Sequence, residues 1–68
     1  MKGLNAKAYK RMVEMGETYT TLLRKLRMYG YELDAKTVYR YVTGKDVPSK
    51  EIKIALAKAL RCLVSDIF

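Results

Sequence analysis

Two basic residues, Lys36 and Arg40, stand four positions apart near the middle of the chain. Residues with this spacing lie on one face of an α-helix, so a helix here would present both charges together. The planar guanidinium of an arginine can donate two parallel hydrogen bonds to a guanine edge, which lysine cannot do with the same planarity. Ala35 and the methyl group of Thr37 could contact a thymine methyl. The segment could therefore read base-pair edges; the alternative is an ordinary solvated helix face.

A second group of polar side chains precedes this segment, at Thr18, Tyr19 and Thr21. These hydroxyls fall at the expected start of a helix, where free backbone N–H groups can also hold a phosphate. Tyr39 points off the apolar stripe of its own segment, so contact with DNA and packing below the surface are both open for it.

Catalytic and metal chemistry find little support in the composition. The chain has no histidine and a single cysteine, Cys62, which excludes an intrachain disulfide and the usual zinc ligand sets. General acid–base catalysis would fall to scattered carboxylates in a protein too small to sequester a substrate. We therefore expect no enzyme activity, no metal, no cofactor and no small-molecule ligand, and we interpret Cys62 as a small apolar filler.

The charge balance favours a polyanionic partner. The 68 residues carry 14 Lys and Arg against seven Asp and Glu, a formal net charge of +7. Residues 1–50 hold 11 of the bases and five of the acids, so most of the positive charge belongs to this part. No apolar run has the length of a membrane span or a signal peptide. We expect a cytoplasmic protein with no membrane partner.

Helix signals account for nearly the whole chain. Asn5 and Gly16 bound a first helix, Thr18 and Gly30 a second, and Asp34 and Gly44 a third. A polar surface loop at 45–48 then leads to a fourth helix opened by Pro48 and Ser49, and Ser65 caps a short fifth. The β-branched residues show no strand alternation. These signals predict one all-α domain over 1–68, a bundle of four to five helices.

Helical spacing also predicts the buried positions. Ile54 lies outside the apolar stripe of its own helix and is expected to be exposed. The inward residues are Ala8, Tyr9, Met12 and Val13; Leu22, Leu23, Leu26 and Tyr29; Val38, Tyr41 and Val42; Ile52, Leu56, Ala59, Leu60 and Leu63; and Ile67 and Phe68 at the end.

The layout over 18–44, two short helices and a connection with a basic outer face on the second, is that of a helix-turn-helix. Three motifs carry a resemblance to a known family: TVYRYVTGK at 37–45, VPS at 47–49 and ALAKALRCLVSDIF at 55–68. With GETYTTLLRKL at 16–26, they make the chain from about residue 7 resemble the lambda-repressor-like, Cro/C1-type (XRE) DNA-binding family. The resemblance implies helices over about 49–68 that complete the bundle.

Several functional expectations come from that resemblance. It implies a sequence-specific transcriptional regulator, a small Cro-type repressor of a phage or mobile element, that binds double-stranded DNA as a homodimer on a two-fold operator. The alternative is a protein-binding adaptor or anti-repressor on the same fold. Base contacts are implied for Ala35, Lys36, Thr37, Tyr39 and Arg40, and phosphate contacts for Thr18, Tyr19, Lys45 and the loop before Ser49.

The chain departs from the family pattern at three places. The stretch from Leu26 to Thr37 is about five residues longer, which favours a second helix extended by roughly one turn. Leu23 stands where alanine is preferred, which implies a wider helix crossing. Arg61 replaces a glycine or asparagine of left-handed conformation, at a cost of about 1–2 kcal/mol if that conformation is kept.

Overall fold

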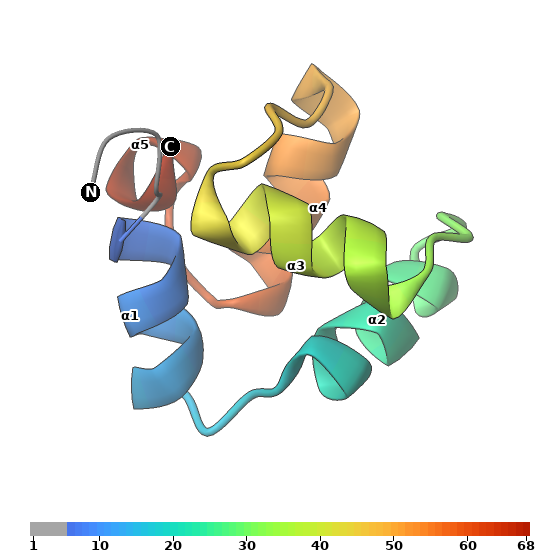
Figure 1. The fold of residues 1–68 in the computed structure, drawn as a ribbon, viewed down its shortest axis with the longest axis horizontal. Helices are drawn as coiled ribbons and strands as arrows, with labels where there is room; N and C mark the ends of the chain where they lie inside the picture. Colours follow the sequence, from blue (N-terminus) through green and yellow to red (C-terminus); the bar gives the residue numbers. More distant parts are fainter. Residues whose placement is uncertain (1–5) are drawn as a thin grey trace.

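The described part of the chain, residues 6–68 of a computed structural model, contains five helices and no strand (Figure 1). The expected all-helical class is therefore confirmed. The proposed cap Asn5 lies outside the described residues. The helices, in chain order, are α1 (Ala6–Glu14), α2 (Tyr19–Met28), α3 (Ala35–Thr43), α4 (Lys50–Ala59) and α5 (Val64–Ile67).

The ends of the middle helices follow the local sequence signals. Thr18 caps α2, where its Oγ1 accepts a hydrogen bond from the Thr21 N–H at 3.2 Å. Asp34 caps α3, where its Oδ1 accepts from the Thr37 N–H at 2.7 Å. At the other end of α3, Gly44 has a φ of 82°, the left-handed conformation that favours glycine. These caps are confirmed as predicted.

The fifth helix begins earlier than predicted, so the assignment of Ser65 as its cap is wrong. Leu63 is the N-cap residue, and Ser65 lies inside the helix. The backbone N–H of Leu63 donates to the carboxylate of Asp66 at 3.0 Å. An acid at the third helical position can satisfy the cap N–H, and it does so here although the cap residue has no polar side chain.

One hydrophobic core joins all five helices. Helix α2 packs against α3 and α4, α1 packs against α3 and α5, and α4 also contacts α5. Tyr41, Leu23 and Cys62 are partly buried at its edge, in keeping with the expected filler role of Cys62. Burial raises the pKa of the Cys62 thiol above its ordinary value. The largest fully buried side chains are Leu22, Leu26, Leu56, Leu60, Ile67, Val38 and Val42.

Several predicted core positions are exposed instead. Tyr9 and Val13 are exposed on α1, because the core-facing side of that helix over residues 7–14 is formed by Ala8 and Met12. Leu63 is exposed because it lies in the turn between α4 and α5, beyond the stripe of either helix. The aromatic residues Tyr29 and Phe68 are also exposed in part, each with a lysine over its ring, Lys58 at 5.0 Å and Lys53 at 5.8 Å. In the other direction, Pro48 of the expected surface loop is buried.

A six-residue connection, 29–34, separates α2 from α3. Helix α2 continues to Met28, which agrees with the apolar stripe that predicted a longer helix. The N–H groups of Gly30 and Tyr31 then donate to the carbonyls of Arg27 and Leu26 at 3.0 and 2.9 Å, which closes the helix end. Tyr31 and Leu33 pack against the core and hold the connection to it.

Arg61 keeps the left-handed conformation, with a φ of 55°. This non-glycine residue sits in the turn after α4, where the family resemblance implies a residue of left-handed conformation. The turn is tied to α1 by Arg11, whose Nε donates to the Leu60 carbonyl at 2.9 Å and whose Nη2 donates to the Arg61 carbonyl at 2.8 Å. The strain of about 1–2 kcal/mol at this position is therefore retained in the fold.

Replacing Arg61 with glycine is expected to stabilise the protein by about 0.5–1 kcal/mol, the relieved strain less the extra freedom of glycine in the unfolded chain. Arg61→Ala is the matched control, because it also removes the side chain but keeps the strain. Urea unfolding of the three proteins measures the difference. Equal stability of the glycine and alanine variants would contradict the prediction, because the relieved strain would then be no larger than the freedom that glycine gains in the unfolded chain.

Candidate nucleic-acid interface

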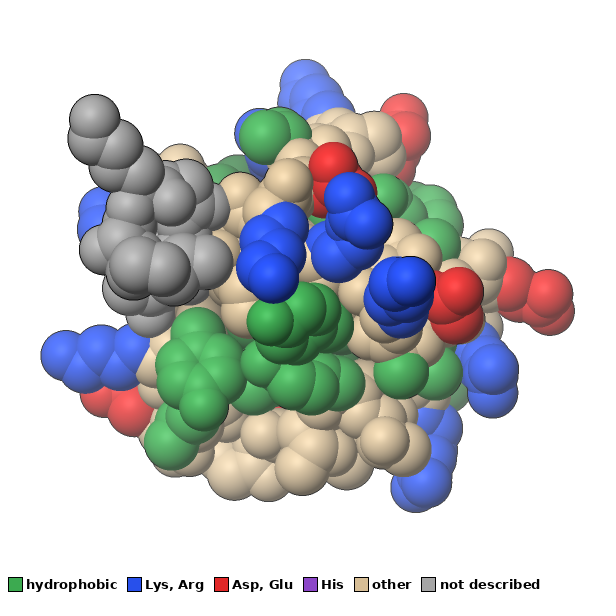
Figure 2. Space-filling view, viewed as in Figure 1, with side chains coloured by type: hydrophobic (Ala, Val, Ile, Leu, Met, Phe, Trp, Pro, Cys, Tyr) green, Lys and Arg blue, Asp and Glu red, His purple; other side chains and the backbone are tan. Residues whose placement is uncertain are grey.

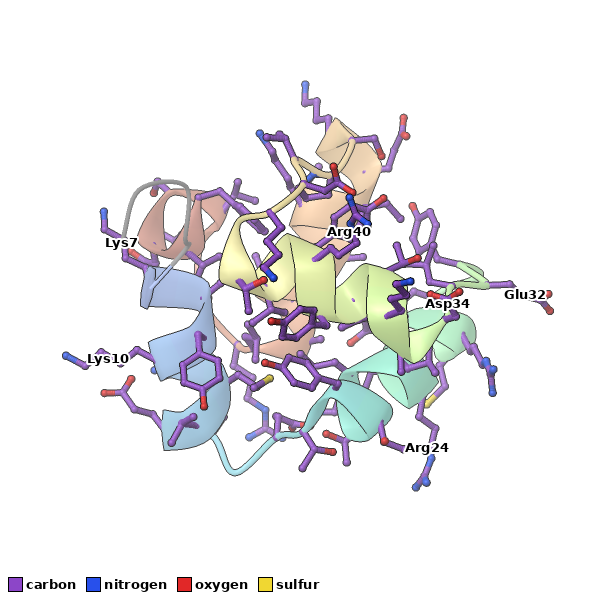
Figure 3. All side chains as sticks on the ribbon, in the orientation of Figure 1. Lys7, Lys10, Arg24, Glu32, Asp34 and Arg40 are labelled. Carbon is purple, nitrogen blue, oxygen red and sulfur yellow. The ribbon has the colours of Figure 1, made fainter. Side chains whose placement is uncertain are left out.

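Helix α3 turns its basic side outward because its apolar side is fully buried. Val38 and Val42, four residues apart, have no exposed surface and fix the rotation of the helix. Lys36 and Arg40 consequently lie on the exposed side, where Figure 3 shows Arg40 projecting from the helix. The prediction that these two charges lie on one exposed face of the helix is confirmed.

Ala35, Lys36 and Thr37 lie in the first turn of α3, at the N-terminal end of the helix. Ala35 and Lys36 are exposed and Thr37 is half-buried. Hydrogen bonds from the Thr37 side chain and N–H hold the pKa of the Asp34 carboxyl below its ordinary value. Asp34 therefore remains ionised as a helix cap, the role the sequence predicted for it, and part of the hydrogen-bonding capacity of Thr37 is used locally.

Three elements meet at the ring of Tyr39. The ring of Tyr19, from the first turn of α2, meets it edge-on, with centroids 5.5 Å apart and planes at 81°. The Nζ of Lys45, from the loop after α3, lies 5.1 Å from the centre of the Tyr39 ring. Burial, with a smaller effect of Tyr9 and Tyr39 nearby, raises the pKa of the Tyr19 hydroxyl, which stays neutral. The predicted residues Tyr19, Tyr39 and Lys45 are thus brought together.

Figure 2 shows this face of the molecule, with Lys and Arg side chains in a row above a band of hydrophobic side chains. The face combines exposed cations from α3 and the following loop with the half-exposed ring of Tyr39. We call it the α3 face, defined by Ala35, Lys36, Thr37, Tyr39, Arg40, Lys45 and Tyr19.

Arg40 is paired with an acid that the sequence reasoning did not single out. Its Nε donates to Oδ2 of Asp46 at 2.9 Å, and both side chains remain about half exposed, at 47% and 51%. The pair spans a turn rather than a helix, so helical spacing gives no signal for it. A carboxylate shortly after the end of a basic helix was the one available hint.

The polar groups at the start of α2 form more hydrogen bonds with one another than expected. The hydroxyl of Thr21 accepts from the Thr18 N–H at 2.8 Å and lies within hydrogen-bond reach of the Glu17 carboxylate. Glu17 also forms an ion pair with Lys25; this contact, and then the Thr21 hydroxyl, lower the pKa of Glu17. The hydroxyls of Thr18 and Thr21 therefore already serve a capping box, and an acid stands beside the proposed phosphate site.

Ser49 lies at the far end of the loop that begins with Lys45. Its Oγ accepts from the Ile52 N–H at 3.5 Å and caps α4. The structure therefore gives Ser49 a capping role and places it on a different helix from the other predicted contacts (Figure 1).

Positive charge is not confined to the α3 face. Lys7 and Lys10 project from α1 and Arg24 from α2, at the edges of the view in Figure 3.

Across residues 6–68, no group of three or more His, Cys, Asp or Glu side chains is placed to hold a metal ion. No helix in this part is long and apolar enough to cross a bilayer.

Comparisons of this chain with protein-family models, with curated proteins and with solved structures give no match.

Proposed function

We propose that this protein is a sequence-specific, DNA-binding transcriptional regulator of the lambda-repressor-like helix-turn-helix class. In this proposal α2, the connection 29–34 and α3 form the helix-turn-helix, and α3 is the recognition helix. The observation that carries the proposal is the exposed pairing of Lys36 and Arg40 on α3, beside the start of α2 and next to Lys45.

The dimensions suit the major groove of DNA. A helix with its side chains is about 10–12 Å wide, and the groove is about 12 Å wide. Side chains in the first two turns of α3, from Ala35 to Arg40, would reach base edges. The start of α2, which contacts α3 through Tyr19 and Tyr39, would then meet the phosphate backbone with those N–H groups that the capping box does not use. Lys45 would meet a phosphate on the other side.

A single recognition helix of nine residues offers few base contacts. We therefore propose that the protein acts as a homodimer and places two α3 faces on half-sites about 34–36 Å apart along the duplex. A two-fold operator and a repressor role follow from the resemblance to small Cro-type proteins.

Selection from a randomised pool of DNA duplexes, followed by titration of the recovered duplex at several salt concentrations, tests the proposal. We expect an enriched motif and a binding constant that falls with salt, with a slope of about −0.9 for each phosphate contacted. Recovery of no motif, or binding that does not respond to salt, would overturn the proposal.

Lys45→Ala should weaken binding to all duplexes to a similar degree and reduce the steepness of the salt dependence by about 0.9, because one phosphate contact is lost. Lys58→Ala is the control. Lys58 lies on α4 over Tyr29 and is not part of the α3 face, so its removal should leave the slope unchanged. Equal slopes for wild type and Lys45→Ala would remove Lys45 from the interface.

A protein-binding adaptor is the second candidate, and the exposure of Ile54 favours it. Ile54 is 50% exposed on α4 and lines a shallow pocket with Tyr29 and Tyr31. An adaptor that uses this side would keep its partner when Arg40 is replaced by alanine, whereas a DNA reader would lose specificity.

A further inference from the structure

We infer that Asp46 positions Arg40 to read a guanine, through the two terminal nitrogens of its guanidinium group. The inference rests on the proposed function and deepens it, because it names one base that the α3 face selects and a residue that sets this selectivity. Asp46 is outside α3 and acts through Arg40, so it is a positioning residue.

The donor geometry of Arg40 carries the inference. A guanidinium has five N–H donors in a planar fork. The Nε donor points to Asp46 at 2.9 Å, which leaves the Nη1 and Nη2 donors for another partner. Two parallel donors of this kind match the O6 and N7 acceptors on the major-groove edge of guanine. With Nε held by Asp46, the terminal pair is the part of the fork that remains available for a bidentate contact.

The backbone holds the carboxylate in place. The N–H groups of Lys45 and Asp46 both donate to the Arg40 carbonyl, at 2.9 and 3.1 Å. Gly44, with its left-handed φ, makes this reversal of the chain possible. The loop therefore folds back on the last turn of α3 and returns the Asp46 side chain to the Arg40 side chain. The ion pair between Arg40 and Asp46 therefore follows from the way the chain reverses at the end of α3.

Charge favours a base over a phosphate as the partner of Arg40. A phosphate beside Arg40 would also lie near the negative carboxylate of Asp46 and would be repelled by it. A guanine edge carries two acceptors and no net charge, so it escapes most of that repulsion. The same carboxylate weakens binding to any duplex that offers no guanine in this place, which is a repulsive contribution to specificity.

The ion pair has little to add to folding stability. Both of its side chains are about half exposed, and ion pairs of this kind contribute little. The backbone hydrogen bonds of the loop do not involve the Asp46 carboxylate. Asp46→Ala is therefore expected to fold like wild type, and thermal unfolding by circular dichroism verifies this.

The test uses the duplex that wild type selects from a random pool, with each guanine replaced in turn by 7-deazaguanine, which lacks the N7 acceptor. We expect one guanine whose replacement costs wild type about 10-fold in affinity. The same replacement should cost Arg40→Ala less than about 2-fold, since the contact is already absent. In Asp46→Ala this cost should fall to about 2–3-fold, while affinity for a random duplex rises because a negative charge is gone.

Glu32→Gln is the matched control, because Glu32 is an exposed acid near the other end of α3 and projects away from Arg40 (Figure 3). It should leave the 7-deazaguanine cost at the wild-type value. An unchanged cost in Asp46→Ala would overturn the inference and leave the proposed function intact, as would the absence of any guanine that depends on Arg40. If wild type selects no duplex, the proposed function fails and the inference falls with it.

Discussion

Replacement of Arg40 with alanine is expected to lower affinity for the selected duplex by about 10- to 100-fold, or roughly 1–3 kcal/mol, and to relax specificity at one base pair. Arg40 is exposed on the outward side of α3, and its terminal donors are free to meet a base edge. Affinity for random duplex should fall much less, because that binding depends on phosphate contacts. Fluorescence titration of both duplexes measures the two effects.

Arg24→Ala is the control for this experiment, because it removes the same charge from α2 at a place that Figure 3 shows directed away from Arg40. It should preserve the preference for the selected duplex. Thermal unfolding should be close to wild type for both variants, since the exposed pair of Arg40 with Asp46 is worth about 0–1 kcal/mol. An Arg40→Ala protein that keeps full specificity would contradict the assignment of α3 as the recognition helix.

Leu26→Ala is expected to destabilise the fold by about 2–5 kcal/mol, the largest effect foreseen for any single change. Leu26 is completely buried on α2, which packs against both α3 and α4. A chain of 68 residues rarely has more than about 3–5 kcal/mol of stability from one core. The variant should therefore be largely unfolded at room temperature, with loss of helical signal in circular dichroism.

Met28→Ala provides the comparison on the same helix. Met28 is 80% exposed, so its truncation should change the free energy of unfolding by no more than about 0.5 kcal/mol. If Leu26→Ala proved as stable as Met28→Ala, the packing of α2 beneath α3 would be wrong, and so would the placement of the α3 face.

The helix limits of this protein could be predicted because they depend on neighbours in the sequence. Thr18 and Asp34 cap helices through N–H groups three residues ahead, and Gly44 ends α3 through its own backbone conformation. The left-handed position of Arg61 was different, because it was expected from the family resemblance and not from a local signal. Ser65 was misplaced because Asp66 offered a second way to satisfy the helix start.

Burial was harder to predict, because it depends on which helices meet. Helical spacing predicts that Val13 and Leu63 belong to apolar stripes, yet no neighbouring helix covers either residue. Val38 and Val42, in contrast, lie on the third helix, which packs between α1 and α2. Because these two valines mark the core side of the helix, helical spacing alone predicts that Lys36 and Arg40 point outward.

The contacts between elements at the α3 face could not be obtained from spacing. The Tyr19–Tyr39 ring contact joins residues 20 positions apart, and the Arg40–Asp46 pair depends on the reversal of the chain at Gly44. The sequence named Tyr19 and Tyr39 separately as candidates, and Asp46 was missed. Tertiary packing thus supplies the arrangement within a site whose residue types were largely foreseen.

The most direct test of the central claim is a titration of isotopically labelled protein with its selected duplex, followed by two-dimensional ¹⁵N–¹H NMR. If α3 enters the major groove, the largest amide shifts will cluster at Ala35–Arg40, at the start of α2 near Tyr19 and at Lys45. Shifts centred on Ile54 and Tyr29, with α3 unaffected, would contradict the account.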